Sequence, residues 1–203
     1  MGNPEIEKEK TKIPEIKGER PALWLYIHGP THYKALTASR EADILLPMAE
    51  KFSTANALVK GNYNKYPYER LNHAWEAKIY PDHGWGGKNG QITDDLFLEK
   101  FRFASSEAQA ILDLTLNDIA SAVQTDEEKG MPVVVFNSQN WVRSGIVTLP
   151  IDKLKGKEIC VSDYSGKACT YTFSPSGKLF FYAENIPSIR SGIMILKMPP
   201  RVG

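Results

Sequence analysis

The feature that most constrains this sequence is a change of hydrophobic period near residues 124–132. Before this point apolar residues recur every three or four positions, which is the period of an amphipathic helix. After it, short β-branched and aromatic runs alternate with turn-forming residues, as in consecutive strands. The change predicts an α+β chain, in which a three-helix bundle over residues 21–125 precedes a small antiparallel β-sheet or sandwich over residues 131–203.

Two helices are expected in the first part of this bundle. Residues 35–59 carry apolar side chains at helical spacing, and Pro47 inside this run predicts a kink because it removes one backbone donor. Residues 68–79 fit a second helix, which Pro81 ends. Its expected apolar stripe consists of Leu71, Trp75 and Ile79.

The third helix has the clearest pattern in the chain. Thr93 or Asp94 can cap its N-terminus, and the acids Asp94 and Asp95 suit the positive end of a helix. An apolar face that continues over many turns predicts a helix packed along the bundle. This face consists of Phe97, Phe101, Ala104, Ala108, Ile111, Leu112, Thr115, Ile119 and Val123.

Several short strands are expected in the second half of the chain. Residues 163–166 and 174–177 have turn chemistry, each with glycine in the last position. Short strands at this spacing are typical of a sandwich or an open antiparallel sheet, and the pattern leaves the strand order open. The strands are expected at about 133–136, 145–149, 158–162, 170–173, 179–183 and 192–196.

Composition excludes some classes of partner. The 25 basic and 24 acidic residues leave a net charge of +1, so no global field attracts nucleic acid or an anionic membrane. No apolar run approaches the ~20 residues that span a bilayer. We expect residues 1–20, which mix charges of both signs, to form a disordered polar leader. The pattern leaves open whether the chain is cytoplasmic or exported after removal of a signal.

The two cysteines, Cys160 and Cys169, flank a predicted hairpin. This placement is compatible with a disulfide across two strands and, more readily, with two reduced, half-buried thiols. Neither cysteine has a histidine or another base nearby in the sequence. A catalytic thiol is therefore not expected.

A glycine-rich loop at residues 82–90 holds the strongest candidate for chemistry. Four of its nine residues are glycine, which implies unusual backbone conformations or close approach to another group. His83 lies in this loop beside Asp82 and near Trp85. A neutral imidazole on such a loop suits a metal ion or a polar substrate. A metal site needs three or four ligands, so His83 is either structural or joined by ligands from a longer polypeptide.

Four segments of the chain, taken in order, resemble one enzyme family. They are residues 25–50, with Leu-Tyr-Ile-His-Gly and Leu-Leu-Pro-Met-Ala-Glu; residues 74–83, with Ala-Trp eight residues before His83; residues 133–145; and residues 183–189. Together they resemble the helical middle domain and the first part of the C-terminal β region of family 38 α-mannosidases. The resemblance implies a retaining, zinc-dependent exo-α-mannosidase whose α/β catalytic domain precedes the helices.

In that family the catalytic domain supplies the nucleophile, the acid/base carboxylate and most zinc ligands, and nothing in this sequence resembles it. The resemblance therefore implies a middle fragment of a glycosidase for terminal α-mannosides, inactive alone, whose partners are mannosides and the remaining domains of the same polypeptide. By position, His83 would be the zinc ligand of the helical region. The family has two histidines and then an acid here, whereas this chain has Asp82-His83-Gly84. Asp82 would replace the missing sugar contact, and Trp85 would stack on a sugar face.

Two other functions fit the same residues. The chain could be a non-catalytic carbohydrate-binding module, or a structural or interaction domain in which the glycine-rich loop is only a strained turn. Zinc content and glycosidase activity distinguish the glycosidase fragment from the binding module and the interaction domain. Only a glycosidase of this family requires His83 for both.

Overall fold

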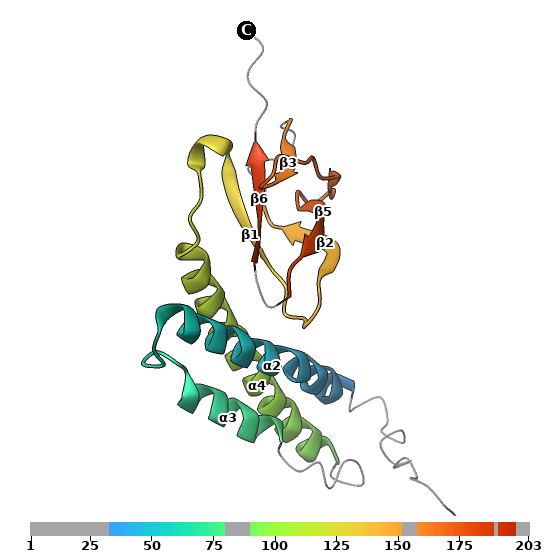
Figure 1. Ribbon diagram of the computed structural model, residues 1–203. Helices are drawn as coiled ribbons and strands as arrows, with labels where there is room; N and C mark the ends of the chain where they lie inside the picture. The colour runs from blue at the N-terminus through green and yellow to red at the C-terminus, as the bar shows by residue number, and fades with distance from the viewer. Residues whose placement is uncertain (1–32, 80–89, 152–157, 189–190, 198–203) are drawn as a thin grey trace, which may run out of the picture.

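In the part of the chain that the structure describes, three α-helices and one short 3₁₀ helix (Glu127–Lys129) precede six strands, which confirms the α+β class (Figure 1). This computed structural model describes residues 33–79, 90–151, 158–188 and 191–197. No helix within these ranges is both long enough and apolar enough to cross a membrane.

The helical part consists of α2 (Tyr33–Lys60), α3 (Tyr68–Lys78) and α4 (Gly90–Ser121). Fully buried alanines lie at the contacts between these helices, and their small side chains let the backbones approach closely. Larger side chains fill the remaining space, which gives a dense apolar core. The buried members of this core are Ala42, Leu46, Ala49, Phe52, Leu71, Ala74, Ala77, Ala104, Ala108, Ile111 and Leu112.

The predicted helices are present, and Pro47 lies inside α2, where the predicted kink stays a prediction. Two details differ. The buried stripe of α3 is Leu71, Ala74 and Ala77, and the predicted member Ile79 is exposed because the helix ends at Lys78. α4 begins at Gly90, so the prediction that Thr93 or Asp94 caps it was wrong. The apolar face of α4 agrees with the prediction from Phe97 to Leu112.

The β part consists of two antiparallel sheets with three strands each. One has the order β1 (Met131–Phe136), β6 (Ser191–Lys197), β3 (Cys160–Asp163). The other has the order β2 (Arg143–Leu149), β5 (Leu179–Ile186), β4 (Tyr171–Phe173). All six predicted strands are therefore present, with small shifts at their ends.

A shared core lies between the two sheets, so the β part is a small sandwich. Alternate residues of β5 and β6, such as Phe181 and Met194, are buried in it together with Val161 of β3. The turn at 174–177 joins β4 to its neighbour β5 through Gly177 (φ 86°), and the turn at 163–166 leads from β3 through Gly166 (φ 93°) to Ala168, which bridges back to Ser162. These left-handed conformations are the reason that glycine ends both turn sequences.

Both cysteines are free, as the sequence favoured. Ser162 bridges to Ala168 and the Cys169 amide donates to the Val161 carbonyl oxygen at 2.7 Å, so Cys169 lies opposite Val161. Because side chains alternate between faces, Cys160 then points to the other side of the ladder. Burial raises the pKa of the Cys169 thiol, which makes this thiol less reactive.

The sandwich packs against the helices at the end of β1. The Phe136 ring meets the Phe52 ring of α2 edge to face, with 5.6 Å between centroids. The Lys51 ammonium donates to the Ser138 carbonyl oxygen at 3.3 Å. The change from helix to strand falls between Ser121 and Met131, close to the change of period in the sequence. The division into domains at residues 21–125 and 131–203 stays a prediction.

Candidate functional site

The site residues expected from the sequence lie outside the described residues. Asp82, His83 and Trp85 belong to the segment 80–89, so their predicted roles in binding zinc and sugar stay predictions. The structure describes the two flanks of this segment, which are the end of α3 at Lys78 and the start of α4 at Gly90.

The end of α3 is held by packing and by charge. The Lys78 ammonium forms an ion pair with the Asp43 carboxylate of α2 at 3.0 Å and lies 5.5 Å from the centroid of the Phe101 ring. The Phe101 ring stacks on that of Phe97, and both are buried against Ala35 at the start of α2. α4 is therefore packed from Phe97 onward, whereas Ile92 in its first turn is 73% exposed.

Within the described part of the chain, no three side chains of histidine, cysteine, aspartate or glutamate gather closely enough to hold a metal ion. His83, the one ligand that the sequence predicts, lies outside the described residues, and a zinc site needs further ligands besides it.

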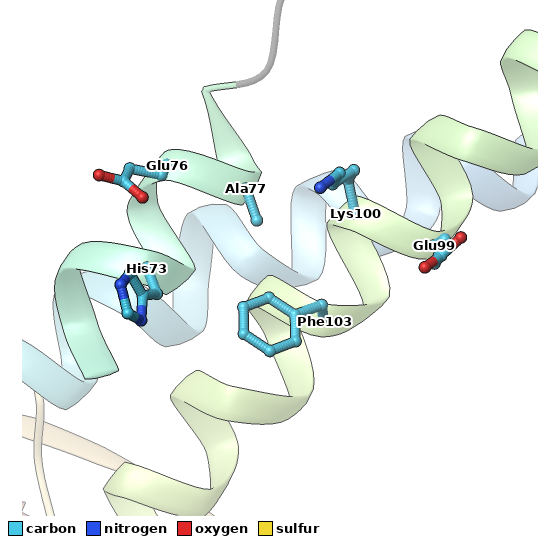
Figure 2. Close-up of a pocket in the computed structure, with 6 residues that line it drawn as sticks. All are labelled: His73, Glu76, Ala77, Glu99, Lys100 and Phe103. Atoms are coloured by element: carbon cyan, nitrogen blue, oxygen red, sulfur yellow. The ribbon is translucent and has the colours of Figure 1, made fainter. Parts of the chain in front are cut away.

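A groove of about 440 Å³ lies between the C-terminal half of α3 and the part of α4 around residues 99–103 (Figure 2). The Phe103 ring, 48% of which is exposed, extends from α4 toward α3. Ala77 leaves room for the groove because its side chain is small. The polar lining side chains are His73, Glu76, Glu99 and Lys100.

This lining combines an exposed aromatic ring with an imidazole, an ammonium group and two carboxylates. An aromatic face can stack on an apolar face of a sugar, and the polar groups can exchange hydrogen bonds with hydroxyls. In Figure 2 the carboxylates of Glu76 and Glu99 lie toward the outer sides of the helix pair, which places them at the rims of the groove. The arrangement suits a neutral polyhydroxylated ligand.

Sequence reasoning missed the groove. His73, which is exposed beside the groove, was not among the predicted site residues. Phe103 was not singled out, although the sequence holds a signal: it is a large aromatic residue outside the apolar face of a strongly amphipathic helix. The groove itself depends on how α3 packs against α4, which periodicity does not specify.

Comparison with solved structures finds a likeness of fold. No known family profile matches the chain, and no curated protein sequence matches it. Among solved structures, the fold is similar to that of an α-mannosidase from Enterococcus faecalis V583, with a TM-score of 0.53 and 17% sequence identity. The match covers 84% of this chain and 24% of that chain.

The likeness establishes a shared fold that spans helices and strands together. The chain covers about a quarter of the length of the α-mannosidase that it matches. At 17% identity the likeness carries no residue-level information on zinc or on sugar contacts. The assignment to family 38 rests on the sequence resemblance.

Proposed function

We propose that this chain is the helical and first β portion of a glycosidase of the α-mannosidase kind, resembling family 38. The observation that carries the proposal is the fold likeness to an α-mannosidase over 84% of the chain. The four sequence segments that resemble family 38 are distributed over the same region, from residue 25 to residue 189. In this proposal the catalytic carboxylates belong to polypeptide outside these 203 residues.

The contribution of this portion to the site would be the segment between α3 and α4. His83 would provide one zinc ligand, while Asp82 and Trp85 would contact a mannoside. The support for this assignment is chemical and positional: a neutral imidazole is a common zinc ligand, and residues 80–89 directly follow α3, whose end is held by the contacts of Lys78.

The test uses the polypeptide that joins this chain to its catalytic portion. Zinc content by elemental analysis and hydrolysis of an aryl α-mannoside are measured for the wild type, His83→Ala and His73→Ala. We expect His83→Ala to lose both zinc and activity. The exposed His73 is the matched control, and its variant should retain both. If His83→Ala keeps its zinc and its activity, the ligand assignment is wrong.

A second function, a non-catalytic carbohydrate-binding module, is favoured by the α3–α4 groove. Here Phe103 would be the stacking platform, with hydroxyl contacts from His73 and the two glutamates. Titration of the ¹⁵N-labelled chain with methyl α-D-mannoside and an α-linked mannobiose should give saturable shifts of groove amides. Phe103→Ala should abolish these shifts, and Leu114→Ala, which removes another exposed apolar side chain of α4, should not. Absence of saturable shifts in the wild type would exclude this function.

A further inference from the structure

A polar hollow lies between the last two turns of α2, the connection from α2 to α3, and α4. We call it the α2–α4 hollow, and its volume is about 270 Å³. Its lining includes Ser53, Asn56, Lys60, Lys65 and Thr115. The hollow adjoins the start of α3, so it lies a helix length, about 16 Å, from the point where the segment of the proposed zinc ligand begins.

Two buried hydroxyls of this lining meet at the base of the hollow. Ser53 and Thr115 are only 3% and 7% exposed, and their side-chain oxygens lie 3.3 Å apart. One hydroxyl hydrogen serves the bond between these oxygens, and the other makes no hydrogen bond with a residue that the structure describes. A buried donor without an acceptor costs free energy. This hydrogen is therefore available to an acceptor that enters the hollow.

The charged side chains that line the hollow are both lysines. The Lys60 ammonium pairs with the Asp118 carboxylate, which also accepts from the Asn56 side-chain amide at 2.8 Å. Lys65 forms no ion pair with a residue that the structure describes. The pKa of Asp118 is lowered chiefly by the hydrogen bonds from Lys60 and Asn56, and the charge of Lys65 adds to this effect. Two ammonium groups and one carboxylate thus leave one positive charge unmatched.

Hydrogen bonds fix the backbone of the connection that carries Lys65. Gly61 (φ 69°) ends α2 in the left-handed conformation, and the Asn62 amide donates to the Ala57 carbonyl oxygen at 3.0 Å. The Asn62 side-chain oxygen in turn accepts from the Asn64 amide at 3.2 Å. A wall that is formed before a ligand arrives loses little conformational entropy on binding.

A second hollow of about 330 Å³ continues the first one along α4. Asn56, Lys65 and Thr115 line both hollows. The lining of the second hollow also includes the exposed Leu114 and the Asp118 carboxylate. A hydroxylated organic group would find an apolar surface and a hydrogen-bond acceptor there.

We propose that the α2–α4 hollow binds a phosphate group, which goes beyond the proposed glycosidase role and does not depend on it. Lys65 supplies the positive charge, and the Ser53–Thr115 pair supplies the buried donor, to oxygens that only accept. A metal cation would meet two ammonium groups here, and a neutral sugar would leave the charge of Lys65 without a partner. The phosphate is either free or an ester of a hydroxylated compound such as a sugar, and the second hollow favours the ester.

The test is a titration of the ¹⁵N-labelled full chain with sodium phosphate, glucose 6-phosphate and glucose at constant ionic strength. We expect saturable shifts of the Asn56, Lys65 and Thr115 amides with both phosphates, at concentrations of about 1 mM or below, and none with glucose. At least about threefold tighter binding of the ester supports the role of the second hollow. Equal affinities support a site for phosphate alone and overturn that role.

Three variants test the named groups. Lys65→Gln should raise the dissociation constant at least about tenfold, and Lys34→Gln, an exposed lysine at the opposite end of α2, should leave it unchanged. Thr115→Val keeps the shape of the side chain but removes its hydroxyl, and should raise the dissociation constant at least about fivefold. Circular dichroism checks that these variants are folded.

Asp118→Asn removes the acid beside the hollow and should lower the dissociation constant at least about threefold, a gain that loss of folding cannot imitate. The proposal is overturned if neither phosphate gives saturable shifts, or if glucose binds as tightly as glucose 6-phosphate. It is also overturned if Lys65→Gln binds phosphate as the wild type does. None of these outcomes affects the zinc and activity test of the glycosidase proposal.

Discussion

At the scale of single residues, Asn137 connects two segments of the sandwich that lie 49 residues apart in the sequence. It is buried, and its side chain bonds to three backbone groups, one of them on Ile186. The sequence showed an asparagine directly after a β-branched run, which suggested a strand end. Its bonding partners were not predictable, because the Ile186 carbonyl lies 49 residues further along the chain. Only the folded sandwich brings the two segments together.

Asn137→Ala should lower the free energy of unfolding by about 2–4 kcal/mol, because it leaves buried backbone groups without partners. Urea unfolding followed by circular dichroism measures this change. Asn140→Ala is the matched control, since Asn140 is exposed in the same segment, and it should change stability by less than about 0.5 kcal/mol. If the free energy of unfolding falls no more for Asn137→Ala than for Asn140→Ala, the role assigned to the Asn137 hydrogen bonds is contradicted.

Asp118 on α4 should contribute to the acid sensitivity of the fold. Its carboxylate pairs with the Lys60 ammonium and accepts from the Asn56 side-chain amide at 2.8 Å, and these contacts hold its pKa below the usual value of 3.8. Because the pKa of Asp118 is lower in the folded state, the ionised carboxylate stabilises the fold above the unfolded-state pKa. This stabilisation is lost as pH falls through the folded-state pKa.

Asp118→Asn should therefore show a smaller drop in melting temperature than the wild type when pH is lowered from about 5 to about 2. Differential scanning calorimetry across this range measures the drop. Asp113→Asn, on the same helix, is the control for the general effect of removing one acid. Equal pH dependence in the wild type and Asp118→Asn would show that the contact with Lys60 has no effect on stability.

At the scale of elements, the sequence predicted the helices and strands better than their pairing. Periodicity located all three helices, and the turn glycines Gly166 and Gly177 separated the strands correctly. Strand order could not be predicted, because β1 pairs with β6 at the far end of the chain, with Met131 opposite Leu196. The start of α4 was misplaced because capping residues were available at Thr93 and Asp94 while the helix extends back to Gly90.

The connection between α4 and β1 depends on Gly130. Its φ is 127°, and a Cβ there would lie 2.6 Å from the Leu196 carbonyl oxygen of β6. Gly130→Ala should therefore destabilise the protein by at least about 1–3 kcal/mol, because both the backbone conformation and the close contact exclude a side chain.

Gly145→Ala is the matched control, since a Cβ at Gly145 meets nothing within 4 Å. It should be neutral or slightly stabilising, by up to about 1 kcal/mol, through the lower entropy of the unfolded chain. Thermal unfolding of both variants provides the comparison. Equal melting temperatures for the two variants would mean that β6 moves away from Gly130 without cost.

At the scale of the whole molecule, the helices and the sandwich form one fold that is also found in an α-mannosidase. The α+β arrangement followed from the change of period in the sequence. The α3–α4 groove did not, because it depends on the placement of Phe103 and on how two helices pack against each other. The predicted site at His83 rests on resemblance and awaits experiment.

The central claim is that this chain supplies part of a glycosidase site whose catalytic carboxylates lie on other polypeptide. The most direct measurement is hydrolysis of 4-nitrophenyl α-D-mannoside by the purified, folded 203-residue chain in the presence of zinc. We predict no turnover above the rate in buffer, for the wild type and for His83→Ala equally. Sustained turnover that His83→Ala abolishes and His73→Ala retains would contradict the claim, since it would place a complete active site within these residues.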